Sequence, residues 1–272
     1  MQIRAGSYRC STAGRKRWFE AAPAKVGAEY GYYDYSADGV ADQTADEAFN
    51  QLESGFPVIR KALLTGVFEA WVDHGQFLLE YAQMLRARSR LFREQVMTQA
   101  RDRIIGVVEE VVAPTVLKFR PYIPSDEPKH EQHLRNLSIT EMGREIAKGA
   151  ALFSNLHWCL RTSQDMSNPV ITADQPVIVL GPAGLSEEAL TRDPNTSIIF
   201  PLCREACLIG NCEKSDADTE PFKASSAKWL RGQFFRADTG FIYSPARVDS
   251  SPFAGMSSTS LPPCGAAKRV DT

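Results

Sequence analysis

The stretch SIIFPLCREACLIG, residues 197–210, decides the class of fold. It contains two short apolar runs, 197–202 and 205–210, in which β-branched and aromatic residues favour strands. Similar runs, most of them bounded by Pro, Gly or Asn, recur in the C-terminal half at 157–162, 170–179 and 240–243, with a helical pattern at 223–235. This half of the chain is therefore expected to form a small, mainly antiparallel sheet.

Before residue 157 the apolar residues recur at the three- and four-residue steps of amphipathic helices. The first helix is expected at 46–64, and Pro57 inside it predicts a kink or a break just before that proline. Later helices are expected at 67–90, 91–112 and 140–156, and the proline-rich segment 113–136 is expected to be a long surface loop. Helices followed by strands, without regular alternation, predict an α+β fold in which the helical N-terminal half packs on the sheet.

Length and composition indicate the domain organisation. A chain of 272 residues, 43% hydrophobic and 24% charged, can bury a sizeable core without disulfides or a structural metal. Aromatic residues and glycines in 1–40 indicate a β-rich opening. We expect one α+β domain over 1–245, helix-rich at 41–156 and strand-rich at 157–245, and a disordered tail rich in Ser, Pro and Gly at 246–272.

Charge and cysteine content restrict the partners and the compartment. A formal net charge of −2 gives no global attraction to nucleic acid or to an anionic membrane. No segment approaches the roughly eighteen apolar residues that span a bilayer, and the N-terminus lacks the apolar region of a secretory signal. The cysteines show no secreted-scaffold spacing, so we expect mostly free thiols, a cytoplasmic location and no membrane partner.

Several segments, taken in order, resemble a bacterial protein family. Residues 81–86, YAQMLR, are similar to an Ala-x-Gln-x-x-Arg helix segment, and 171–177, ITADQPV, to a strand that ends in Ser-Asp-Asn-Pro. The segment 199–202, IFPL, is similar to a Phe-Pro-Leu strand, and Glu53 lies in a helix that resembles a glutamate-bearing first long helix. From roughly residue 15 to residue 245 the chain thus resembles the family catalogued as domain of unknown function 4238, for which no biochemistry is established.

The chain departs from the pattern of that family in two ways. The family opens with a His-Tyr-Val-Pro motif that this chain lacks, so we expect its start to be truncated or misassigned. Ala173 and Gln175 replace the usual Ser and Asn on either side of Asp174, and Ala87-Arg88 replaces a Thr-Pro pair.

Asp174 is the first candidate site residue. It interrupts an apolar strand pattern that runs from Val170 to Val179. A carboxylate at the end of a buried strand must be paired, protonated or bound to a cation, which makes Asp174 a candidate metal ligand or general base. Alternatively, Asp174 caps a turn before Pro176 by accepting hydrogen bonds from nearby backbone amides, and this is the interpretation we favour.

Arg86 and Glu53 complete the candidate catalytic set. Arg86, Arg90 and Arg93 share one helical face by their spacing, which is typical of a patch that binds phosphate or nucleic acid. We favour instead a solvated face on which Arg86 pairs with Glu53 or Asp174 across the core. Glu53 is also the leading candidate for a second acid beside Asp174.

The remaining motifs are weaker. His130 and His133 are of metal-ligand type, but a proline-rich loop favours plain surface residues. Cys203, Cys207 and Cys212 lack the Cys-x-x-Cys spacing of zinc sites, and those on strands are expected to act as small buried hydrophobes. No nucleophile elbow, Walker loop, dinucleotide fingerprint or His-Glu-x-x-His helix occurs, so no cofactor is identified.

Two functions from different classes follow. The one we favour is a non-enzymatic or regulatory interaction protein, because the sequence shows no catalytic constellation. The alternative is a metal-dependent hydrolase or nuclease that acts on a phosphate-containing substrate, with Asp174 in the centre, Arg86 steering the phosphate and Glu53 as the second acid.

Overall fold

The computed structural model describes part of the chain. The residues described are 7–11, 18–21, 35–37, 40–42, 44–65, 69–111, 128–163, 169–213, 219–221, 224–236 and 241–244. The tail expected at 246–272 and residues 113–127 of the expected loop therefore lie outside the described residues.

Four long helices make up most of the described N-terminal half. They are α1 (Thr44–Leu64), α2 (Glu69–Ala87), α3 (Arg90–Val111) and α4 (Pro128–Phe153). In α1, Phe49, Ile59 and Leu63 form one buried face, and acidic residues in the first turn with Lys61 in the last complement the helix dipole. The helices expected at 46–64, 67–90 and 91–112 are confirmed, with ends that shift by a few residues.

α1 continues through Pro57, so the chain has no break there. Pro57 is exposed, and the side chain beside it, Val58, is 72% exposed. The proline removes the amide hydrogen that would bond the carbonyl of Glu53, but on the solvent side of a helix water can satisfy that carbonyl. The surrounding apolar pattern therefore outweighs the proline.

α4 begins at Pro128, and the loop expected as far as residue 136 was wrong from there on. Proline is well suited to the first turn of a helix, where its missing amide hydrogen would have no partner in any case. The helix expected at 140–156 is the second half of α4, and Ala150 and Phe153 are buried as its periodicity predicts.

A five-stranded sheet forms the centre of the C-terminal half. Its strands are β5 (His157–Thr162), β7 (Ile178–Leu180), β8 (Ser197–Cys203), β9 (Ala206–Asn211) and β10 (Thr219–Pro221). The order is β10-β5-β9-β8-β7, and every neighbouring pair is antiparallel except β10 with β5. The predicted α+β class with a mainly antiparallel sheet is confirmed.

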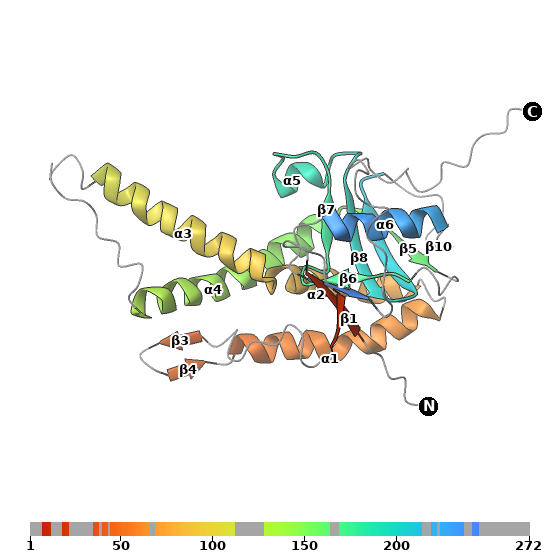
Figure 1. The fold of residues 1–272 in the computed structure, drawn as a ribbon, viewed down its shortest axis with the longest axis horizontal. Coiled ribbons are helices and arrows are strands. Elements are labelled where there is room, and N and C mark those ends of the chain that lie inside the picture. Colours follow the sequence, from red (N-terminus) through yellow and green to blue (C-terminus); the bar gives the residue numbers. More distant parts are fainter. Residues whose placement is uncertain are drawn as a thin grey trace, which may run out of the picture.

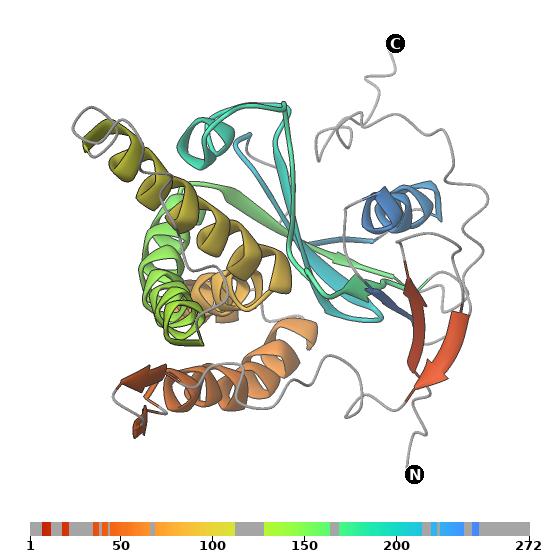
Figure 2. The same cartoon turned by 60° about the vertical axis from the view of Figure 1, so that its left-hand side comes forward.

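Helices cover both faces of this sheet, as Figure 2 shows. Phe200 and Leu208, which are paired in register, belong to the core shared with α1, α2 and α4. Ile199 and Ile209, also paired, face the other way and pack with Phe234 of α6 (Ala224–Arg236). Because both faces are buried, β8 and β9 are almost continuously apolar instead of alternating.

A second sheet joins the two ends of the described chain. Its order is β2-β1-β11-β6, formed by β1 (Ser7–Ser11), β2 (Trp18–Ala21), β6 (Thr172–Ala173) and β11 (Phe241–Ser244). The strand-like run expected at 170–179 is therefore two strands in two sheets, and the chain changes sheets at 174–177. The β-rich opening is confirmed, and it includes the pair β3 (Tyr35–Ala37) and β4 (Val40–Asp42).

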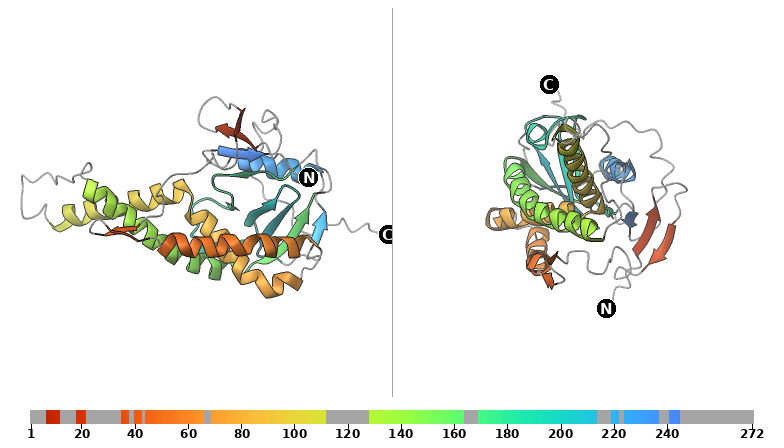
Figure 3. Two further views of the ribbon diagram at one scale, coloured as in Figure 1. Left: turned by 90° about the horizontal axis from the view of Figure 1, so that it is seen from below. Right: turned by 90° about the vertical axis from the view of Figure 1, so that its left-hand side faces the viewer.

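The helices also share a small core of their own. Phe49, Met84, Ala87 and Met142 form it, one or two from each of α1, α2 and α4. α3 contacts α4, and both helices extend beyond the sheet, where they diverge (Figures 1 and 3). None of the described helices combines the length and the apolar character that crossing a bilayer requires.

Candidate functional site

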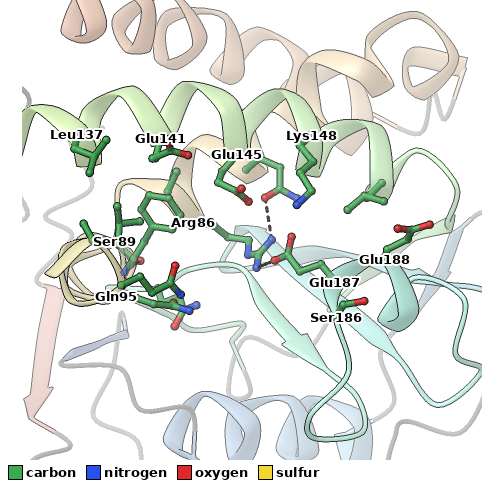
Figure 4. Close-up of a pocket in the computed structure, with 18 residues that line it drawn as sticks. Arg86, Ser89, Gln95, Leu137, Glu141, Glu145, Lys148, Ser186, Glu187 and Glu188 are labelled. Carbon is green, nitrogen blue, oxygen red and sulfur yellow. Dashed lines mark hydrogen bonds and ion pairs between the residues drawn. The ribbon is translucent and has the colours of Figure 1, made fainter. Parts of the chain in front are cut away.

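A pocket of about 510 Å³ lies where α2 ends, α3 begins and α4 passes both of them. The short helix α5 (Glu187–Leu190) and the residue before it, Ser186, form the opposite wall. Figure 4 shows side chains from these elements converging on one space. The volume is within the range of small-molecule binding sites.

Arg86 is fixed in the wall of the pocket by three contacts. Its Nη1 donates a hydrogen bond to Oε1 of Gln83 at 2.9 Å, and its Nη2 pairs with Oε1 of Glu187. The guanidinium also lies 5.4 Å from the centre of the Phe153 ring, within range of a cation–π interaction. The side chains of Arg86 and Glu187 are 19% and 33% exposed. This largely shielded pair ties α5 to the end of α2 (Figure 4).

Gln83 is the most buried polar residue that lines the pocket, at 3% exposure. Because its Oε1 accepts from Arg86, the orientation of the amide is set, and Nε2 is the end that is left. Neither Nε2 of Gln83 nor Nε of Arg86 has a hydrogen-bond partner among the described residues. A buried donor without a partner costs about 1–3 kcal/mol. Both nitrogens belong to residues that line the pocket, so they are the candidate donors for an acceptor bound there.

Gly149 of α4 allows the amide of Gln83 to lie directly against that helix. A Cβ atom at residue 149 would be 2.4 Å from the amide carbon of Gln83 and 2.6 Å from its nitrogen and oxygen. The amide thus lies within one helical turn of Glu145 and Lys148, which line the pocket from the same helix.

Gly149→Ala is expected to destabilise the protein by about 1–2 kcal/mol, because the added methyl group overlaps the confined amide of Gln83. Gly143→Ala on the same helix is the matched control. Its Cβ would meet nothing within 4 Å, so it should stabilise the protein by up to about 1 kcal/mol. Urea unfolding measures both changes, and equal effects would contradict the close approach of α2 to α4.

Most acidic side chains of the pocket already have a cationic partner. Glu141 accepts a hydrogen bond from Arg144 at 2.7 Å, and Glu188 accepts one from Arg192 at 2.8 Å. The third, Glu187, is paired with an arginine as described above. Each of these three carboxylates therefore has a cationic partner, and the pair of Glu187 with Arg86 is the one that is largely shielded from solvent.

Glu145 and Lys148 differ from the other charged residues of the pocket. Within the described part of the chain neither has an ion pair, either with the other or with a third residue. They lie three residues apart on α4 and extend toward the space above Arg86 and Glu187 (Figure 4). Glu145 is half-buried, and Lys148 is exposed at the rim. The pocket thus offers one carboxylate and one ammonium group for binding.

The two serines that line the pocket serve as helix caps. Ser186 Oγ accepts from the backbone amide of Ala189 at 3.3 Å, which caps α5, and Ser89 Oγ accepts from the amide of Phe92 at 3.2 Å at the start of α3. The turn before α5 contains Gly184, whose φ of 83° is in the region that glycine favours. The hydroxyls of Ser89 and Ser186 therefore hold the walls of the pocket in place.

Asp174, the first candidate from the sequence, lies at the edge of this site. It is half-buried in the bend after β6, and its Oδ1 accepts a hydrogen bond from the hydroxyl of Tyr243 in β11. The next residue, Gln175, lines the pocket, whereas Asp174 is not among the lining residues.

Glu53 lies on α1 and pairs with Arg88, just past the end of α2. The prediction that Arg86 pairs with Glu53 or Asp174 was wrong. Arg86 pairs with Glu187, and neither Glu53 nor Asp174 is among its described contacts. Burial raises the pKa of the nearby Tyr81 hydroxyl, and the negative charge of Glu53 raises this pKa further. The three candidate catalytic residues therefore belong to three separate sets of contacts.

The arginine face expected on α2 and α3 is not solvated at its two described side chains. Arg93 is 8% exposed, and the side chain of Arg86 is 19% exposed. The side chain of Arg90 lies outside the described ones. An electrostatic nucleic-acid surface needs accessible cations, which Arg86 and Arg93 do not supply.

Residues of the types that bind metals are dispersed in the described part of the chain. No three His, Cys, Asp or Glu side chains there form a group able to hold one metal ion. His133 is exposed on α4, and the side chain of His130 is outside the described ones. The four cysteines with described side chains are free thiols, and Cys207 is buried as expected. Burial raises the pKa of the half-buried Cys203 thiol.

Sequence reasoning missed most residues of the pocket. Ser186 followed by two glutamates is a recognisable helix start and was a usable signal for α5. Gln83 lies in the YAQMLR segment that carried the family resemblance, yet its burial depends on Gly149 in another helix. Glu145 and Lys148 have no local signature, because surface charges at this spacing are common on helices.

Comparison with known proteins supports the resemblance. A family model described as "Protein of unknown function (DUF4238)" matches residues 8–231, which is most of the chain, and the chain belongs to this family. No curated protein and no solved structure matches it.

Proposed function

We propose that this member of the DUF4238 family is a non-enzymatic binding protein that holds a small polar ligand in the pocket between α2, α4 and α5. The observation that carries the proposal is the amide of Gln83, buried to 3% exposure with a donor that no described residue satisfies. Proteins rarely keep such a donor beside a cavity unless an acceptor from solvent or ligand reaches it.

The construction of the pocket also supports a binding role. Arg86 and Glu187 neutralise each other, and Ser89 and Ser186 cap helices, so these groups hold the walls in place. A preorganised pocket loses little conformational entropy when it binds, which raises affinity. The free thiols support a reducing, cytoplasmic compartment as part of the same proposal.

The alternative is a metal-dependent hydrolase or nuclease that uses Asp174 with Arg86 and Glu53. It draws no support from the described contacts, since the partners of these residues are Tyr243, Glu187 and Arg88 respectively. A phosphate approaching Arg86 would also meet the carboxylate that already pairs with it.

A binding screen by thermal shift tests the proposed function, with probes that differ in charge: L-leucine, inorganic phosphate, putrescine, succinate and glucose. We expect at least one probe to raise the melting temperature of the wild-type protein, because a ligand that binds only the folded state stabilises it. Gln83→Met should abolish that shift, since it removes the buried donor while it keeps the length of the side chain.

Gln76→Met is the matched control, because Gln76 is exposed on the same helix and bonds only its neighbour Glu80 among the described residues. It should leave the shift unchanged. A shift that persists in Gln83→Met, or no shift with any probe, would overturn the proposed function.

A further inference from the structure

We infer that the ligand is a small zwitterion, an α-amino acid with an apolar side chain, whose ammonium group pairs with Glu145 and whose carboxylate is held by Lys148 and Gln83. This inference rests on the proposed function and names the class of ligand for the same pocket. It follows from the charges of Glu145 and Lys148, which form no ion pair with any described residue.

The charge balance of the pocket favours a ligand with no net charge. Three of its four carboxylates are paired with arginines, as shown above. The charges that remain are one negative, Glu145, and one positive, Lys148. A phosphate or a dicarboxylate would bring negative charge to Glu145, and a polyamine would bring positive charge to Lys148. A zwitterion satisfies both residues.

The spacing of the two charges fits a short molecule. Residues three apart on a helix have Cβ atoms roughly 5–6 Å apart, so a bound molecule that bridges Glu145 and Lys148 carries its own charges a few bonds apart. The ammonium and carboxylate groups of an α-amino acid are separated by one carbon. Figure 4 shows both side chains reaching into the same part of the pocket.

The buried donors determine which end of the ligand lies deeper. Nε2 of Gln83 and Nε of Arg86 can only donate, so they require an acceptor. A carboxylate offers about four acceptor positions on its two oxygens, enough for Lys148 and for these donors together. The amide of Gln83 lies against α4 at Gly149, adjacent in sequence to Lys148. The carboxylate end is therefore assigned to this side.

The lining includes apolar residues that an apolar side chain of the ligand can contact. Ala87, Phe92, Val96 and Leu137 line the same pocket from α2, α3 and α4. With a volume of about 510 Å³, the pocket has room for a side chain of the size of leucine beside the charged groups.

Isothermal titration calorimetry of the full chain with three probes tests the inference. L-Leucine should bind, and L-leucinamide, which lacks the carboxylate, and N-acetyl-L-leucine, which lacks the ammonium group, should bind at least tenfold more weakly. A charge-assisted hydrogen bond that is lost accounts for roughly this factor.

Two variants assign the ends of the ligand. Glu145→Gln should weaken L-leucine at least tenfold but leave N-acetyl-L-leucine unchanged, and Lys148→Gln should weaken L-leucine but not L-leucinamide. Glu47→Gln is the matched control, since this carboxylate is exposed on α1 and does not line the pocket, and it should change the affinity less than threefold.

The outcomes separate this inference from the proposed function. Equal binding of the three leucine probes, or wild-type affinity for L-leucine in Glu145→Gln, would overturn the zwitterion. If L-leucine does not bind and another probe such as phosphate binds in a manner that Gln83→Met abolishes, the inference fails and the proposed function stands. If no probe binds, both fail.

Discussion

Phe200→Ala is expected to lower the free energy of unfolding by about 3–5 kcal/mol, the range for removal of a phenylalanine from a packed core. Phe200 is 1% exposed on the face of β8 that meets the helices. Its ring centre lies 6.1 Å from that of Phe56 in α1 and 6.2 Å from that of Tyr81 in α2. These rings join the sheet to both helices, and Phe56 and Tyr81 stack on each other at 4.2 Å.

Equilibrium unfolding in urea, followed by circular dichroism, measures this loss. Val58→Ala is the control, because Val58 is 72% exposed on α1 and should change the stability by less than about 0.5 kcal/mol. A loss below about 1 kcal/mol for Phe200→Ala would mean that the helices do not pack on the sheet through this cluster.

Arg86→Met is the second substitution with a large expected effect, a loss of about 2–4 kcal/mol together with loss of ligand binding. The change leaves the carboxylate of Glu187 without its partner in a largely shielded site, and removes the bond to Gln83 and the contact with the Phe153 ring. Because Glu187 is about a third exposed, water offsets part of this cost, and the loss should stay below that of a fully buried pair.

A double-mutant cycle with Glu187→Gln isolates the contribution of the ion pair. Arg192→Met provides the control. The side chain of Arg192 is 76% exposed and pairs with Glu188 of α5, so this pair should contribute less than about 0.5 kcal/mol to the free energy of unfolding. If Arg86→Met is no more destabilising than Arg192→Met, the link between α2 and α5 does not hold the wall of the pocket.

The fold was predictable where a local pattern determines structure. The periodicity of Phe49, Ile59 and Leu63 predicts α1, and the apolar runs predict β5, β8 and β9. The errors came at prolines and at a change of sheet. Pro128 is the first residue of a helix, and Pro57 lies on the exposed side of another. Sequence alone does not distinguish such prolines from prolines that end a helix or lie in a loop.

The site was much less predictable, because long-range contacts build it. Arg86 was a candidate from its helix segment, but its acid, Glu187, is 101 residues away and has no pattern that links the two. The burial of Gln83 depends on a glycine of α4. The identification of Glu145 and Lys148 depended on knowing which neighbouring charges were already paired, which only the packing reveals.

The side-chain amide of Gln83 offers the most direct test of a ligand site in this pocket. Its signals in a proton–nitrogen correlation spectrum can be assigned by their disappearance in Gln83→Met, and then followed as L-leucine is added to the wild-type protein. We predict that they shift and saturate with the bound fraction, because Nε2 gains its acceptor from the ligand. If calorimetry records binding while these signals stay in place, the ligand lies elsewhere and the account of this pocket is contradicted.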